Sequence, residues 1–127
     1  MEGLDGFKAL SDALQDRAQS GVINGLDGRP IRIQRSYAAL NYLLQSAGAI
    51  ICKMWLRRAY QLLKENNIEF LPLAFVHDEM QISVKEEDAQ EAIIHITQAM
   101  KDVEHQLKFR CQLDSEAQIG NNWSECH

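Results

Sequence analysis

The spacing of hydrophobic residues along the chain alternates between helical and strand-like periods, and this change separates the expected elements. Apolar residues three or four positions apart predict three helices, over residues 5–19, 37–66 and about 86–107. Short apolar runs on either side of turn-forming residues predict two hairpins, over 22–33 and 71–84. The pattern therefore predicts an α+β fold, with a small antiparallel sheet backed by long helices.

One further strand is expected after the last helix. Apolar and polar residues alternate strictly from Leu107 to Asp114. A period of two is typical of a strand with one buried face. The remaining tail, 121–127, is polar around Trp123.

The composition is that of one folded domain without a membrane span. The chain has 127 residues, of which 46% are hydrophobic and 24% charged. Its three cysteines lie far apart and no basic-then-apolar leader opens the chain, which indicates reduced thiols in a cytoplasmic protein. The uncharged stretch 36–52 is short for a membrane span and contains Asn41 and Gln45. We expect this stretch to be a helix buried on most sides by other protein.

Charge is unevenly distributed along the chain. The net charge of -5 argues against a free-standing nucleic-acid clamp. Residues 1–70, however, carry nine Lys/Arg against seven Asp/Glu, whereas residues 71–127 carry four against eleven. This asymmetry indicates a phosphate-facing patch beside an acidic metal site. The alternative is two solvated faces without a shared function.

The turn of the second hairpin, His77-Asp78-Glu79, holds the strongest candidates for chemistry. A carboxylate at a rigid turn can be aimed at a metal ion, and Mg²⁺ prefers hard oxygen ligands. Asp78 is the better ligand because its short side chain is more tightly fixed. Glu79 need not share that role, since neighbouring residues of a strand point to opposite faces. The alternative is a charged turn that only connects two core strands.

Two amides form a second group of candidates. Asn41 and Gln45 are four residues apart and so project from one face of the predicted helix. The minor groove of DNA presents an acceptor on every base, so amide donors can test the shape of a base pair without reading its sequence. The alternative is that both amides satisfy buried backbone groups.

Two other metal chemistries fit less well. A His-Asp pair also occurs in HD phosphohydrolases, but there it lies on a helix, whereas strands flank it here. Cys52, Cys111, Cys126 and His127 lack the close paired spacing of structural zinc sites.

Taken together and in this order, these segments resemble the family A (DNA polymerase I-like) DNA polymerases. Residues 75–82 are similar to motif C of that family, and residues 38–49 are similar to the helix that precedes it. The Gly28-Arg29 hairpin and the closing Asn122-Trp123 also fit. The likeness is greatest to the bacteriophage branch, including the final Cys126-His127.

The resemblance implies roles for matching residues. Asp78 matches the metal-binding aspartate, Glu79 its acidic neighbour with a lesser catalytic role, and His77 a residue near the primer terminus. Asn41 and Gln45 match amides that contact the minor groove of the primer–template.

Basic residues before the amides are a weaker part of the resemblance. Arg29 matches an arginine of the hairpin, and its contact with DNA is inferred from position alone. Tyr37 stands where many cellular relatives carry a DNA-binding arginine. A phenol cannot neutralise a phosphate, so Arg35 is expected to compensate.

The resemblance implies that residues 1–127 are the C-terminal part of a polymerase palm. The complete enzyme would transfer a nucleotidyl group from a dNTP to the primer 3′-hydroxyl with two Mg²⁺ ions, of which this chain supplies only part of the site. The motif A aspartate, the fingers helix and an exonuclease have no match here. We expect the chain to be inactive alone and to join an upstream polymerase portion in the host cytoplasm. The alternative is a non-catalytic interaction module that keeps only the palm fold.

Overall fold

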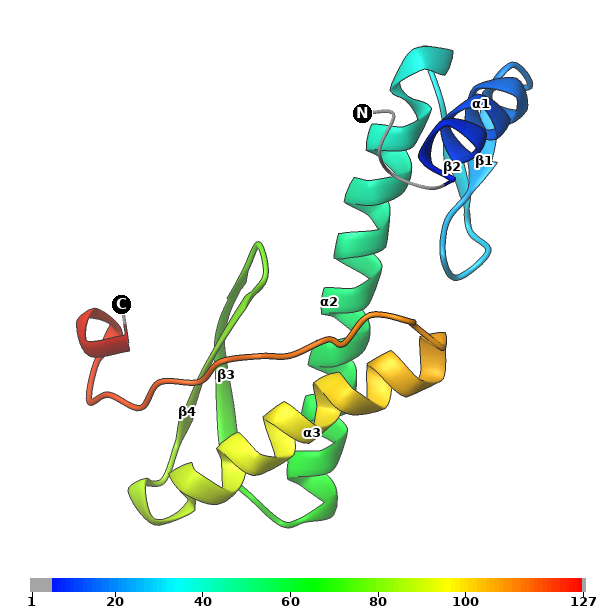
Figure 1. Cartoon of the computed structure of the whole chain (residues 1–127). Coiled ribbons are helices and arrows are strands. Elements are labelled where there is room, and N and C mark those ends of the chain that lie inside the picture. Colours follow the sequence, from blue (N-terminus) through cyan, green and yellow to red (C-terminus); the bar gives the residue numbers. More distant parts are fainter. Residues whose placement is uncertain (1–5, 127) are drawn as a thin grey trace. The chain divides into compact units, whose positions relative to one another are not determined.

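The computed structural model describes residues 6–126 and divides into two compact units, residues 1–50 and 51–127. Its α+β class agrees with the prediction, although the strands form two separate two-stranded sheets. Two residues named above, Asp5 of the first predicted helix and His127, lie outside the described part. The elements, shown in Figure 1, are α1 (Phe7–Ala18), β1 (Val22–Asn24), β2 (Pro30–Arg32), the 3-10 turn η1 (Ser36–Ala38), α2 (Ala39–Glu65), β3 (Phe70–Val76), β4 (Glu79–Val84), η2 (Glu86–Asp88), α3 (Ala89–Leu107) and η3 (Trp123–Cys126).

The first unit folds around the short hairpin of β1 and β2. These strands pair antiparallel, with Ile23 opposite Ile31. Ile23 is buried in a cluster that also contains Leu14 of α1. The hairpin turns where the Gly28 N–H donates to the Gly25 carbonyl at 3.0 Å. Gly28 has a φ of +84°, a conformation that glycine adopts at little cost, and this turn places Arg29 at its exit.

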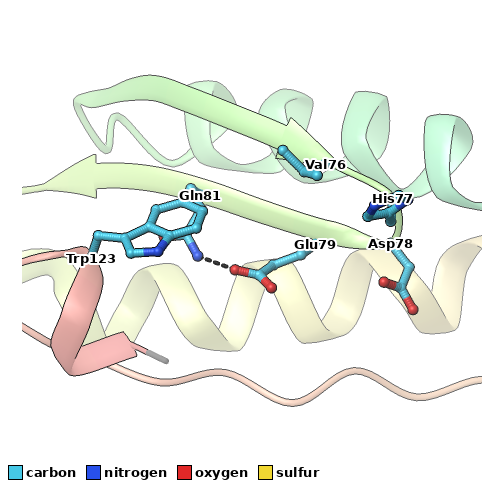
Figure 2. A pocket seen from close by; sticks show the side chains of 6 residues that line it. All are labelled: Val76, His77, Asp78, Glu79, Gln81 and Trp123. Carbon is cyan, nitrogen blue, oxygen red and sulfur yellow. Dashed lines mark hydrogen bonds between the residues drawn. The ribbon is translucent and has the colours of Figure 1, made fainter.

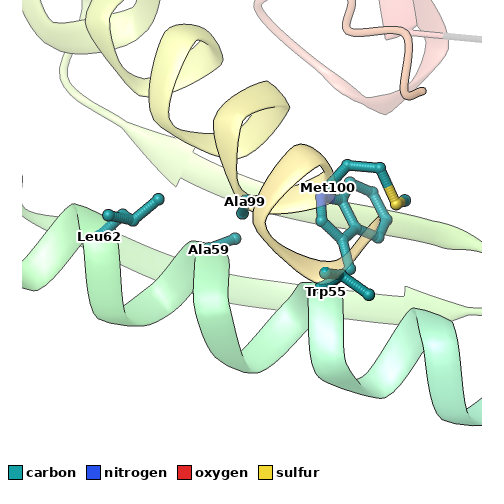
Figure 3. Close-up of a cluster of buried hydrophobic side chains, with 6 residues drawn as sticks. Trp55, Ala59, Leu62, Ala99 and Met100 are labelled. Atoms are coloured by element: carbon teal, nitrogen blue, oxygen red, sulfur yellow. The ribbon is translucent and has the colours of Figure 1, made fainter. Parts of the chain in front are cut away.

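The second unit is built on the packing of α2 against α3. Figure 3 shows the small side chains of Ala59 and Ala99 between the two helices. Both are 0% exposed, and their size allows the helix backbones to approach closely. The indole N–H of Trp55 donates to the Ile96 carbonyl at 3.0 Å, which fixes the Trp55 ring within the cluster. These contacts form the platform on which the second hairpin rests.

The hairpin of β3 and β4 packs one face against this platform. Phe75 and Met80 are partners in register and contact the cluster around Trp55. Phe70 and Ile82 contact a second buried cluster that includes Leu63. Because side chains alternate along a strand, the neighbouring residues of β4 face away from this core.

The strand predicted from Leu107 to Asp114 is wrong. Helix α3 continues to Leu107 and ends at Lys108, which has a left-handed φ of 55°. The Phe109 N–H closes the helix by donating to the Glu104 carbonyl at 3.2 Å. Within residues 6–126 no strand pairs with the following segment. Its apolar alternation reflects instead the packing of Leu107 and Leu113 against the helix cluster.

The apolar stretch at the start of α2 is more open than expected. Leu44 is 60% exposed, and Asn41, Gln45 and Gly48 are also exposed. The described residues therefore do not bury this part of the helix. In the part of the chain that the structure describes, no helix combines the length and the apolar character needed to span a membrane.

Candidate functional site

The turn of the second hairpin consists of His77 and Asp78. Val76 and Glu79 are the last paired residues, so only two residues connect β3 to β4. Such short connections require left-handed backbone conformations, and His77 accordingly has a φ of 56°. Both turn residues are exposed, whereas Glu79 is half-buried. The structure thus confirms that the three ionisable residues lie at a hairpin turn.

A pocket of about 230 Å³ lies beside this turn. In the view of Figure 2, the carboxylates of Asp78 and Glu79 extend from the same side of the hairpin. The Gln81 side-chain amide donates a hydrogen bond to Oε1 of Glu79. Trp123 of the C-terminal tail lies close to Gln81. The lining residues are Val76, His77, Asp78, Glu79, Gln81 and Trp123.

Cys52 of α2 lies within electrostatic reach of the turn. Burial raises the pKa of its thiol, and the negative charge of Asp78 raises that pKa further. The thiol is half-buried and belongs to a free cysteine. It therefore presents a neutral, weakly nucleophilic group near Asp78 at ordinary pH. This proximity could not be predicted from the sequence, because Cys52 lies on α2 and Asp78 at the β3–β4 turn.

Two carboxylates at the hairpin turn have the donor chemistry of a magnesium site. Asp78 and Glu79 offer carboxylate oxygens, the donor type that Mg²⁺ prefers. Within residues 6–126, however, no group of three or more His, Cys, Asp or Glu residues is placed to hold a metal ion. The donor chemistry of Asp78 and Glu79 therefore fits Mg²⁺, but these two residues alone do not form a complete site among the described residues.

Asn41 and Gln45 share one exposed face of α2. The Gln45 side-chain amide donates to Oδ1 of Asn41 at 3.4 Å. Both residues are exposed, which does not fit a role in satisfying buried backbone groups. A Cβ atom at Gly48 would meet no atom within 4 Å apart from neighbouring residues of its own helix, so the backbone there has free space beside it. A hydrogen-bonding partner can reach both amides.

The two candidate arginines differ in their partners. Arg29 forms an ion pair with Asp27 at 2.6 Å. The hydrogen bond between them lowers the pKa of Asp27 and raises that of Arg29, so the guanidinium charge is largely offset by its neighbour. Arg35 instead donates a hydrogen bond to the Tyr37 hydroxyl at 2.8 Å. Because this hydroxyl is neutral, it does not offset the positive charge of Arg35. A phosphate contact therefore suits Arg35 better than Arg29.

Sequence comparison relates most of the chain to known polymerases. The family model "DNA polymerase family A" matches residues 19–125. The DNA-directed DNA polymerases of Enterobacteria phage T3 and Escherichia phage T7 are each 42% identical over 112 residues, which cover 83% of this chain. A DNA polymerase I of Caldicellulosiruptor bescii is 32% identical over 96 residues, or 72% of this chain. The chain spans only 16% of each of the two phage relatives and 11% of the bacterial one.

Structural comparison gives a consistent fold. The POL domain of Pol1 from M. smegmatis, solved in complex with a DNA primer-template and dNTP, superposes with a TM-score of 0.68. The match covers 77% of this chain and 20% of that chain at 23% sequence identity.

Proposed function

The chain belongs to DNA polymerase family A, and from this premise we propose that it supplies the C-terminal palm portion of a DNA-directed DNA polymerase. The complete enzyme transfers a nucleotidyl group from a dNTP to the primer 3′-hydroxyl under the direction of a template. The observation that carries this proposal is the two-residue turn that presents His77 and Asp78 above a buried platform. It occurs in the segment that resembles motif C, and the phage relatives, which are DNA-directed DNA polymerases, support the reaction class.

Asp78 is the metal ligand in this proposal. Its short side chain stands at the tip of the turn, is exposed, and is anchored by strands on both sides. Bound Mg²⁺ would offset the negative charge that develops on the transferred phosphoryl group. Glu79, half-buried and hydrogen-bonded to Gln81, supports the site from the adjacent position. His77 lies at the same turn and contacts the primer terminus.

The first unit contributes contacts to the primer–template. The exposed amides of Asn41 and Gln45 donate to minor-groove acceptors, which occur on every base pair. Arg35, positioned by its hydrogen bond to Tyr37, contacts a phosphate. Arg29 has a smaller role, because Asp27 already occupies its guanidinium.

An upstream polymerase portion completes the active site. The 127-residue sequence contains no match to a motif A aspartate or to the fingers helix, and it spans 16% of the phage relatives. The missing segments act together with this chain, either on the same polypeptide or as a separate subunit. The phage relatives favour action in the cytoplasm of a host cell.

Primer extension with defined components tests the proposal. The purified chain is assayed alone, together with the polymerase portion encoded upstream of it, and together with that portion as the Asp78→Asn variant. We expect extension only from the wild-type pair. Extension by the isolated chain, free of host polymerase, contradicts the requirement for an upstream portion. A folded wild-type pair that extends no primer makes the chain a non-catalytic interaction module.

A further inference from the structure

The C-terminal tail reaches the pocket beside the catalytic turn. Trp123 lies in the tail, which approaches this hairpin after a long segment without regular structure, and it lines the same pocket as His77, Asp78 and Glu79. In the view of Figure 2 its indole ring overlaps the Gln81 side chain, and both residues line the same pocket. The ring is 53% exposed, so burial in a hydrophobic core does not account for its position.

The tail turn from Gly120 to Cys126 is closed by its own contacts. The Asn121 N–H donates to the Glu125 carboxylate at 2.7 Å, and the Glu125 N–H donates to Oδ1 of Asn122 at 3.1 Å. This reciprocal arrangement is similar to a capping box. A Cβ atom at Gly120 would lie 2.6 Å from the Glu125 Cβ, so only glycine allows the turn to close in this form. The turn therefore contributes to holding Trp123 through contacts within residues 120–126.

Gln81 connects Trp123 to the candidate catalytic residues. Glu79 and Gln81 are two positions apart on β4 and so share one face of the strand. The Gln81 amide donates to Oε1 of Glu79. A glutamine side chain has several accessible rotamers, and a neighbouring indole restricts them. Restricting Gln81 keeps its donor directed at the Glu79 carboxylate.

We propose that Trp123 is a positioning residue, held by the C-terminal turn, which fixes Gln81 and through it the carboxylate of Glu79 beside Asp78. Partners that orient metal ligands and their neighbours commonly affect metal affinity or activity by about 10–100-fold when removed. The catalytic consequence rests on the proposed function, whereas the positioning of Gln81 is a property of this chain.

The positioning is tested by NMR on the ¹⁵N-labelled 127-residue chain, with the side-chain amide of Gln81 as the probe. In Trp123→Leu, loss of the ring current should move both amide protons towards the values of a freely rotating glutamine. Trp123→Phe should retain part of the shift. Ile119→Ala is the matched control, because Ile119 is 51% exposed on the same tail and does not line the pocket. Unchanged Gln81 signals in Trp123→Leu overturn the inference.

The catalytic consequence is tested in the complete polymerase by single-turnover incorporation over a range of Mg²⁺ concentrations. Trp123→Leu should slow incorporation, or raise the Mg²⁺ requirement, about 10-fold with unchanged DNA affinity. Gly120→Ala keeps the indole but opens the turn and should have the same effect, whereas Ile119→Ala should not. Normal rate and Mg²⁺ dependence in Trp123→Leu overturn the catalytic part. A wild-type polymerase that extends no primer refutes the proposed function, and the NMR result then still decides the positioning.

Discussion

Asp78→Asn should separate catalysis from folding. Asp78 is exposed at the tip of a two-residue turn, and asparagine has almost the same shape and suits turns equally well. The free energy of unfolding should therefore change by less than about 0.5 kcal/mol. A neutral amide is a poor replacement for a carboxylate ligand of Mg²⁺. We expect incorporation to slow on the order of 10³-fold, equivalent to about 4 kcal/mol of activation barrier.

Glu79→Gln provides the comparison within the same hairpin. Glu79 is half-buried and accepts a hydrogen bond from Gln81, and a glutamine at position 79 still offers an acceptor oxygen. The incorporation rate of Glu79→Gln should fall on the order of 10-fold, equivalent to about 1.4 kcal/mol of activation barrier. The ratio of the two losses thus measures which carboxylate is the principal ligand.

The assay for both variants is single-turnover incorporation by the complete polymerase at saturating dNTP and Mg²⁺, with thermal unfolding and DNA affinity measured in parallel. DNA affinity should not fall in Asp78→Asn, since the change removes a negative charge close to phosphates. Near-normal incorporation by Asp78→Asn would exclude it as a metal ligand. A larger loss from Glu79→Gln would identify Glu79 as the principal carboxylate.

Four further substitutions test the amides and the packing of the second unit. Asn41→Ala or Gln45→Ala should each slow primer extension by roughly 1–3 kcal/mol, most strongly from a mismatched terminus, and wild-type rates on every primer would make the amides dispensable. Burial raises the pKa of Asp102, but hydrogen bonds, led by one from Arg58, outweigh it and lower that pKa below 3.8. The ion pair of Asp102 with Arg58 should therefore stabilise the fold fully above pH 3.8, and this stabilisation should be lost as the pH falls through the lowered pKa. Chemical denaturation should show that Asp102→Asn is less stable than wild type at pH 7. The two proteins should be equally stable in strong acid. Val103 is buried, at 1% exposed. The Val103→Ala substitution should lower the free energy of unfolding by about 2–3 kcal/mol. A decrease of less than about 0.5 kcal/mol would contradict the place of Val103 in the core.

The elements that sequence predicted correctly are those fixed by local chemistry. The turn at His77 and Asp78 follows from two apolar runs separated by polar residues, and the end of α2 follows from Asn66-Asn67, where Asn67 takes a left-handed φ of 57°. The strand expected from Leu107 to Asp114 failed because a strand needs a partner. Alternating apolar and polar residues indicate only that one face of a segment is buried. Leu113 is partly buried against the helix cluster and not within a sheet.

Side-chain partnerships within the site depend on contacts that periodicity does not encode. The proximity of Trp123 to Gln81 is set by the path of the irregular segment before the tail turn, although the spacing of Asn122 and Glu125 contains a local signal for the turn itself. The ion pair between Arg29 and Asp27 was open to prediction, because acid and base lie two residues apart on the same turn. Because Asp27 offsets the charge of Arg29, the phosphate-facing patch inferred from the uneven charge loses one free cation, and Arg35 is the better candidate for a phosphate contact.

The contacts that hold Asp78 lie within the second unit, and this has a consequence for assembly. Phe75 and Met80 anchor the hairpin on the α2–α3 platform, and Trp123 of the tail lines the pocket beside its turn. The direction of the Asp78 carboxylate should thus be set before the upstream portion joins. Under the proposed function, assembly would supply the other metal ligands and the dNTP site, and it would not have to fold the turn. Hydrogen-exchange protection of the β3–β4 amides should accordingly be similar in the isolated chain and in the complete polymerase. Protection that develops only on assembly would show that the upstream portion builds the turn.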